Sequence, residues 1–219
     1  MWADLCMPWQ ACLEEAWAAY CSGSIPIGSV VIDGEGKILS LGRNRIWNSA
    51  VPLPPGQVCH TELAHAELNA LLALGIDQGD RRAWALYTTT EPCPLCLGAF
   101  YMSGIRTLHY ASRDPWAGST NLLGTTPYLS RKTIQVTGPQ GNPQLEAIIV
   151  ALFVEWELYL LRERLSVVRE ALQVIIPQGV RLGTELYHSG ELRQMASNGT
   201  CAEVVYNHLA DSIGILGGS

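Results

Sequence analysis

Two stretches of the chain decide its fold: TELAHAELNAL, residues 61–71, and TTEPCPLCLGAF, residues 89–100. The apolar spacing of the first predicts a helix, and the second reads as the end of a strand followed by a helix. The first carries a histidine and a glutamate near its start, and the second carries a Cys-x-x-Cys pair just after a proline. A histidine and a glutamate fill an apolar core poorly, so we expect both helix starts to carry chemistry.

Working outward from these stretches, the pattern predicts an α/β fold. Helices are expected at residues 8–21, 62–75, 94–103 and 143–164, and strands at 29–32, 37–41, 84–89, 107–111 and 133–137. This order is typical of a three-layer α/β/α arrangement around a mixed five-stranded sheet. About twenty residues, with a helical turn expected near 120–124, separate the last two strands. Because a parallel pair needs a crossover of a dozen or more residues, we expect these last two strands to be parallel.

The composition limits the classes of partner. The chain has 219 residues and a formal net charge of −6, and its lysines are Lys37 and Lys132. Nucleic-acid binding relies on clustered Lys and Arg, so binding of nucleic acid is not expected. No uncharged stretch is long enough to span a bilayer, and the first residues lack the features of a signal peptide, so no membrane association is expected. With seven cysteines and no secretory signal, we expect reduced thiols and a cytoplasmic protein.

The histidine and the two cysteines form a candidate zinc site. Cys93 and Cys96 lie three residues apart, which places both thiols on one helix face. A helix start favours negative charge and therefore the thiolate form, and Zn²⁺ prefers thiolates together with a neutral imidazole such as that of His65. Three protein ligands leave room for a water as the fourth, which is typical of a catalytic site rather than a structural one. Glu67, beside this centre, is the candidate proton shuttle.

These residues resemble a known family. HAE at residues 65–67 with PCPLC at 92–96 matches the H-x-E…P-C-x-x-C signature of the zinc-dependent nucleobase deaminases. The longer runs AHAELNAL, TTTEPCPLCLGA and HYASRDPWAG resemble the tRNA-adenosine deaminase and guanine deaminase branch of the cytidine deaminase-like superfamily. The resemblance covers roughly residues 8–160, and a parallel last strand pair also resembles this branch.

The resemblance implies a hydrolytic mechanism. It implies one Zn²⁺ per subunit, bound by His65, Cys93 and Cys96, with a water or hydroxide as the fourth ligand. The hydroxide attacks the amino-bearing carbon of a base. Glu67 takes the proton of the water, protonates a ring nitrogen and then helps ammonia to leave, and the backbone N–H of Cys93 stabilises the attacking oxygen.

The resemblance also implies substrate contacts. Asn44, in GRNR, stands where the family places a base-binding asparagine, and the backbone of Ala66 is expected to contact the base. Asp114 lies in a loop that the family uses for substrate recognition, and Trp116 is a candidate for stacking on the base. Simpler interpretations stay open: Asn44 and Asp114 are also ordinary turn residues, and a tryptophan such as Trp116 is more often part of a core or an interface than stacked on a base.

Two further residues precede the second helix. Cys59 and His60 are close enough in sequence to approach the site. We expect them in the wall of the pocket rather than among the metal ligands. A site closed by either residue would instead indicate a structural zinc centre.

The chain is expected to divide into two parts. Residues 1–164 form a cytidine deaminase-like catalytic domain, and residues 165–219 form a helical C-terminal extension packed on it. Within the extension, helices are expected near 184–196 and 200–213. The apolar segment 145–161 has two interpretations that stay open here: a core helix covered by the extension, or a subunit interface.

Three functions compete. The first is a zinc-dependent deaminase of an amino-substituted nucleobase or nucleoside, acting on a free purine-type or related heterocycle as a homodimer. The second is a tRNA or single-stranded nucleic-acid adenosine deaminase that uses arginines along one rim. The third is a zinc-stabilised binding protein without turnover. The acidic chain favours the first.

Overall fold

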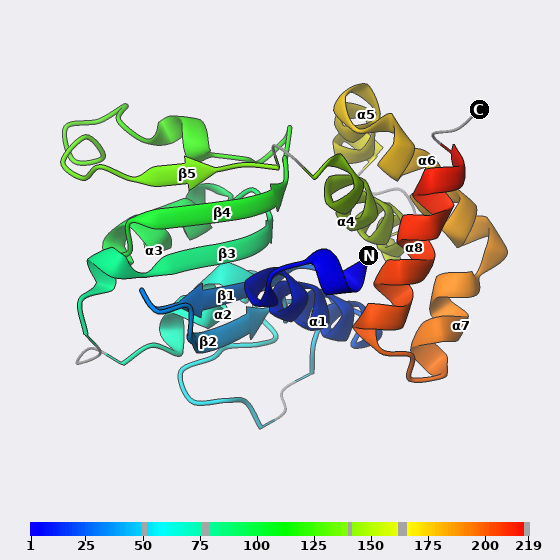
Figure 1. The fold of residues 1–219 in the computed structure, drawn as a ribbon, viewed down its shortest axis with the longest axis horizontal. Coiled ribbons are helices and arrows are strands. Elements are labelled where there is room, and N and C mark those ends of the chain that lie inside the picture. The colour runs from blue at the N-terminus through cyan, green and yellow to red at the C-terminus, as the bar shows by residue number, and fades with distance from the viewer. Residues whose placement is uncertain (50–51, 76–78, 140–141, 162–165, 217–219) are drawn as a thin grey trace.

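The computed structural model describes residues 1–49, 52–75, 79–139, 142–161 and 166–216 (Figure 1). One five-stranded sheet has the order β2-β1-β3-β4-β5. Its strands are β1 (Gly28–Ile32), β2 (Ile38–Arg43), β3 (Ala85–Thr90), β4 (Thr107–Ser112) and β5 (Gln135–Thr137). β1 pairs antiparallel with both β2 and β3, whereas β3-β4 and β4-β5 are parallel. The mixed five-stranded sheet and the parallel last pair predicted from the sequence are therefore confirmed.

Eight α-helices lie within the described part of the chain. Their bounds are α1 Met7–Cys21, α2 Ala66–Leu72, α3 Pro94–Ser103, α4 Pro143–Trp156, α5 Ser166–Ile175, α6 Pro177–Ser189, α7 Glu191–Ser197 and α8 Ala202–Leu216. Short helical turns are η1 Trp2–Asp4, η2 Arg81–Ala83, η3 Thr120–Leu122 and the π-helical η4 Glu157–Leu161. None of these described helices combines the length and the apolarity that crossing a bilayer requires.

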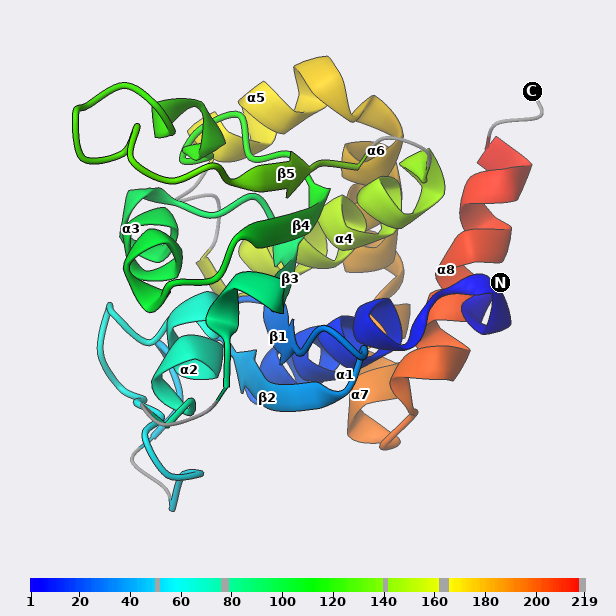
Figure 2. The same cartoon turned by 60° about the vertical axis from the view of Figure 1, so that its left-hand side comes forward.

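Helices cover both faces of the sheet, as the three-layer prediction required. Figure 2 shows α2 and α3 on one side of the strands and α1 and α4 on the other. The strand residues alternate accordingly: Val31 packs in the α2–α3 core with Phe100, and Val30 packs against Cys12 of α1. The carboxyl ends of β3 and β4 point toward the helices that follow β5 (Figure 1).

α4 is a core helix. Apolar side chains are buried all round it, against α1 on one side and against α6 and α8 on the others. The interpretation as a core helix is therefore confirmed for α4, whereas Tyr159 and Leu160 in the rest of the segment 145–161 are exposed. The expected end of this helix at residue 164, and the expected domain boundary beside it, lie outside the described residues.

Several expected helix boundaries were wrong, among them the end of the second helix at residue 75, since α2 ends at Leu72. α2 begins at Ala66 rather than at residue 62, because the carbonyl of Ala64 accepts the N–H of Arg45 (2.9 Å) and so is not free for a helical partner. The single helix expected near 184–196 is two helices, since Gly190 at φ 70° turns the chain between α6 and α7.

The approach of α2 to β2 depends on Gly42. A Cβ at this position would lie 2.3 Å from both the Ala66 carbonyl oxygen and the Ala70 nitrogen. We expect Gly42→Ala to lower the free energy of unfolding by about 1–3 kcal/mol, because the helix must move off the sheet. Urea unfolding checks this expectation.

The matched control is Gly98→Ala in α3. No atom lies within 4 Å of a Cβ built there, so the same substitution should stabilise the helix by about 0.5–1 kcal/mol. A loss at Gly98 as large as that at Gly42 would contradict the explanation by close packing.

Candidate metal centre and active site

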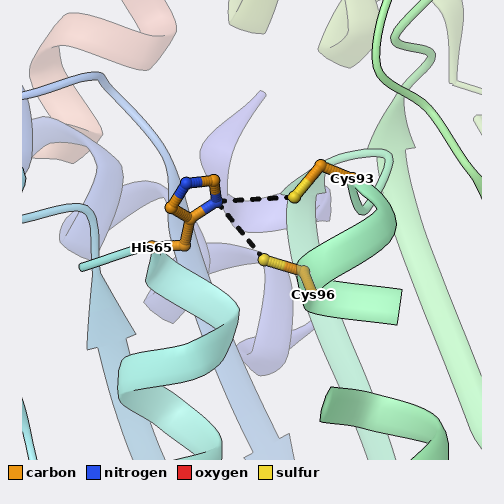
Figure 3. Close-up of side chains that lie close together, drawn as sticks. All are labelled: His65, Cys93 and Cys96. Atoms are coloured by element: carbon orange, nitrogen blue, oxygen red, sulfur yellow. Dashed lines mark hydrogen bonds between the residues drawn. The ribbon is translucent and has the colours of Figure 1, made fainter. Parts of the chain in front are cut away.

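The sequence-predicted ligands meet at the starts of two helices. His65 is the N-cap of α2, Cys93 is the N-cap of α3, and Cys96 lies in the first turn of α3. The Nδ1 atom of His65 is 3.6 Å from Sγ of Cys93 and 3.4 Å from Sγ of Cys96 (Figure 3). The expectation that the two helix starts converge is therefore met in the geometry.

This donor set fits Zn²⁺. The three ligand atoms all lie within 4.8 Å of one another. A tetrahedral zinc with bonds of about 2.3 Å to sulfur and about 2.0–2.1 Å to nitrogen holds such ligands about 3.6 Å apart. The observed separations of 3.4 and 3.6 Å between sulfur and nitrogen match that geometry. The residues present could therefore hold the ion with little movement.

Cys59 and His60 do not join this group. In the part of the chain that the structure describes, the candidate metal group consists of one histidine and two cysteines. The thiol of Cys59 instead lies 3.7 Å from the carbonyl oxygen of Ser49, and His60 is exposed at φ 55°. Neither residue lines the cavity described below, so the expectation that they form part of its wall was wrong.

The local sequence explains how α3 presents its cysteines. Pro94 occupies the first position of the helix, where its missing N–H costs no hydrogen bond. The carbonyl of Cys93 accepts the N–H of Leu97 (2.9 Å), which begins the helical ladder. Leu97 and Phe100 then anchor the helix in the core, so the cysteines stay at its start, with Cys93 half-buried and Cys96 buried.

The two thiols differ in acidity. The pKa of Cys93 is lowered to about 4, because its thiolate accepts hydrogen bonds from the thiol of Cys96 and from the ring of His65. The pKa of Cys96 is raised, because it donates to Cys93 and is buried. The pKa of His65 is raised by its hydrogen bond with Cys93. One thiolate is thus available at neutral pH, in the chemical form that binds a metal.

Glu67 is buried beside the metal group. Its side chain is 4% exposed, and its carboxylate accepts hydrogen bonds from the thiol of Cys96 (3.3 Å) and from the hydroxyl of Thr88 (3.1 Å). Burial raises the pKa of Glu67. A buried carboxyl group beside a metal group is suited to take and return a proton during a reaction.

Sequence reasoning missed Thr88. It lies in β3 on the face toward α2, since Leu86, two residues earlier, packs in the α2–α3 core. The two-residue alternation of the predicted strand was the signal that could have found it, because it places a hydroxyl opposite the helix that carries Glu67.

A cavity of about 250 Å³ opens beside the metal group. His65, Glu67 and Cys93 line it together with residues from three other parts of the fold. These are Ile25, Pro26 and Ile27 before β1; Thr90, Glu91, Ser112, Arg113, Asp114, Trp116 and Ala117 at the ends of β3 and β4; and Ile149, Val150, Phe153, Val168 and Leu172 from α4 and α5. The volume lies just below the roughly 300–1,000 Å³ of drug-sized ligand sites.

Two of the four predicted substrate contacts line this cavity. Asp114 and Trp116 do, and Trp116 is 62% exposed rather than in the core. Asn44 and Ala66 are buried and lie outside the lining. The side-chain oxygen of Asn44 accepts the hydroxyl of Ser24 (2.8 Å), a partner that the sequence did not indicate.

Two carboxylates hold the loop after β4: that of Asp114 in the loop itself and that of Glu91 after β3. One carboxylate oxygen of Asp114 accepts the N–H groups of Trp116 and Ala117, both at 2.9 Å. The carboxylate of Glu91 accepts the N–H groups of Asp114 and Thr120. Asp114 therefore is a turn residue, and the same turn places it against the cavity.

Residues 6–112 match the family described as the cytidine and deoxycytidylate deaminase zinc-binding region. This chain carries that region. The chain has the cytidine deaminase-like fold. The matched region includes the three candidate ligands and Glu67.

Curated relatives within this deaminase family differ in substrate. The chain is 29% identical over 115 residues to a cytosine deaminase of Candida albicans, covering 52% of this chain and 70% of that protein. It is 34% identical over 109 residues to a tRNA-specific adenosine deaminase of Haemophilus influenzae, covering 49% of this chain and 57% of that protein.

A solved guanine deaminase of Nitrosomonas europaea shares the deaminase fold, with a TM-score of 0.51 and 25% identity over 69% of this chain and 84% of the other. These relatives are all named as deaminases and differ in substrate, so the reaction and the substrate of this chain are left to be proposed.

We expect Cys93→Ser and Cys96→Ser to lower the affinity for zinc by at least 100-fold, because a serine hydroxyl is a poor substitute for a thiolate ligand. Competition with a chromophoric chelator measures the affinity. X-ray absorption of the zinc-loaded protein should show two sulfur ligands. Cys201→Ser is the matched control, since this exposed cysteine is outside the metal group and should leave the affinity unchanged.

We expect Thr88→Val to lower the free energy of unfolding by about 1–3 kcal/mol, because the substitution removes a hydrogen bond from the buried carboxylate of Glu67. Thr88→Ser keeps the hydroxyl and should lose less. Urea unfolding of both variants tests this, and equal losses in the two would show that the methyl group, not the hydroxyl, matters.

Proposed function

We propose that this protein is a zinc-dependent hydrolytic deaminase. It converts an amino-substituted nucleobase or nucleoside, in our proposal a free purine-type or related heterocycle, to the oxo form with release of ammonia. The observation that carries this proposal is the buried Glu67, 3.3 Å from a cysteine of the metal group and in the wall of the same cavity. A structural zinc site would need neither the carboxylate nor the cavity.

Each protein residue has a role in the proposed reaction. His65, Cys93 and Cys96 would hold one Zn²⁺, and a zinc ion bound there would supply an activated water at neutral pH. Glu67 accepts a proton from the water while the oxygen of the water attacks the amino-bearing carbon of the base. It passes this proton to a ring nitrogen. It then delivers the second proton of the water to the departing amino group, which leaves as ammonia while the carbonyl forms.

The proposed catalytic contribution of Cys93 goes beyond binding zinc. As the N-cap of α3, its backbone N–H lies at the positive end of the helix dipole. We propose that this N–H donates a hydrogen bond to the oxygen that gains negative charge during the attack.

The substrate contacts expected from the sequence complete the proposal. Trp116 is exposed at the cavity and is assigned to stack on the base, and Asp114 is assigned to a polar edge of the base. Contacts of Asn44 and the backbone of Ala66 with the base stay predictions, since both residues lie outside the lining of the cavity. The homodimer, the cytoplasmic location, a role in purine metabolism and the division into residues 1–164 and 165–219 stay predictions.

A nucleic-acid substrate is the second candidate. The relative in Haemophilus influenzae is a tRNA-specific adenosine deaminase, which favours this candidate. Against it stand the formal net charge of −6 and a cavity lined by Glu67, Glu91 and Asp114. Phosphate groups are repelled by such a surface, so a small uncharged substrate is the better fit.

The deciding experiment measures ammonia released by the zinc-loaded protein. The compounds are guanine, adenine, cytosine, their nucleosides, oxidised purines and a tRNA anticodon stem-loop. We expect release from at least one small compound, and Glu67→Gln should reduce the rate by about 10²–10⁴-fold while zinc stays bound.

The matched control is Glu62→Gln, an exposed glutamate in the turn before α2, which should keep the wild-type rate. Release from the RNA alone would establish the second candidate. No release from any compound, with zinc bound at full occupancy, would favour a binding protein without turnover.

A further inference from the structure

The cavity beside Glu67 has an apolar wall that comes from α4 and α5. We call this feature the apolar wall and define it by five side chains: Ile149, Val150 and Phe153 of α4, and Val168 and Leu172 of α5. Ile25, Pro26 and Ile27 continue the apolar lining. α5 lies beyond residues 6–112, so this part of the site is not supplied by the zinc-binding region.

The apolar wall is firmly held. Arg169 of α5 forms an ion pair with the buried Glu157 after α4 (2.6 Å). The guanidinium of Arg113, after β4, donates to the carbonyl oxygen of Ile175 at the end of α5 (3.4 Å). Leu172 packs in one core cluster with Val150. The wall is therefore part of the folded structure and presents a defined surface.

The charges around the cavity disfavour an anionic substituent. Three lining residues carry carboxylates: Glu67, Glu91 and Asp114. Among the described lining residues, the one guanidinium is that of Arg113, and it already forms a two-bonded ion pair with Glu146 (2.8 and 2.9 Å). A phosphate in this cavity would face carboxylates with no unengaged arginine to balance it.

We propose that the apolar wall is a subsite for a neutral apolar substituent on the substrate heterocycle. This inference rests on the proposed deaminase function and makes its substrate class more specific. The base is an amino-substituted heterocycle with an alkyl or aryl group, rather than a nucleotide. The metal group and Glu67 act on the amino-bearing carbon while the substituent replaces water against α4 and α5.

The test compares matched compounds. The probes are adenine and cytosine, each unsubstituted, with a methyl, propyl or benzyl group on a ring nitrogen, as the ribonucleoside, and as the nucleoside 5′-monophosphate. Ammonia release gives kcat/KM for the zinc-loaded protein, and calorimetry with Glu67→Gln gives Kd without turnover. We expect each buried methylene to improve kcat/KM or Kd by up to about fourfold, and the monophosphate to be at least tenfold poorer than the nucleoside.

Variants of α5 test whether the preference for apolar substituents comes from the apolar wall. Val168→Ser and Leu172→Ala should lower the ratio of propyl-substituted to unsubstituted kcat/KM, or the corresponding ratio of Kd values, by about three- to tenfold. Val168 is only partly buried, so its variant remains informative if Leu172→Ala folds poorly. The matched control is Val174→Ala, because this α5 side chain is 81% exposed and lies outside the cavity. Its ratio should stay at the wild-type value.

The outcomes separate the subsite from the deaminase function. Ammonia release with no preference for apolar substituents, or with a preference for the monophosphate, overturns the subsite and leaves the function standing. A substituent-dependent Kd without ammonia release from any probe supports the subsite and overturns the function. Neither release nor substituent-dependent binding overturns both.

Discussion

The site depends on one constraint: two helix starts must meet at the same edge of the sheet. A helix start has unpaired N–H groups and a partial positive charge, which stabilise a thiolate or a carboxylate nearby. The structure uses this twice: Glu67 lies in the first turn of α2, and Cys93 is the N-cap residue of α3. The strands that place these helices differ in kind, since α2 packs on β2 of the hairpin and α3 connects the parallel strands β3 and β4. Displacing either helix would separate the histidine from the cysteines.

Local patterns were enough to predict the sheet and the metal group, because the information lies within short segments. The spacing of Cys93 and Cys96 places both on one helix face, and the length between the last strands requires a crossover. Long-range contacts explain what the sequence did not reveal. The start of α2 is set by an Arg45 N–H about twenty residues away, and the partner of Asn44 is Ser24. Val168 lines the cavity together with Ile27, although more than half of the chain separates the two residues.

α4 shows how the apolar surface of a helix that is apolar nearly all round can be buried by other helices of the same chain. Its surface is divided between α1 on one side and α6 and α8 on the others. The acidic residues at its end stay in the interior because each has a cationic partner: Glu155 pairs with Arg193, and Glu157 pairs with Arg169. Buried pairs of this kind stabilise little by themselves, but removing one partner leaves an uncompensated charge. They therefore fix the packing of α5 and α7 against α4.

The reactive groups and part of the cavity wall come from different segments of the chain, which has a consequence for how such proteins diverge. The groups that bind metal and move protons belong to residues 65–96, whereas part of the surface that would meet the rest of a substrate belongs to α5, some seventy residues later. Changes in the later segment can alter which molecules fit without disturbing the groups that react. One ancestral chemistry can in this way be inherited intact while selection acts on a separate stretch of the gene.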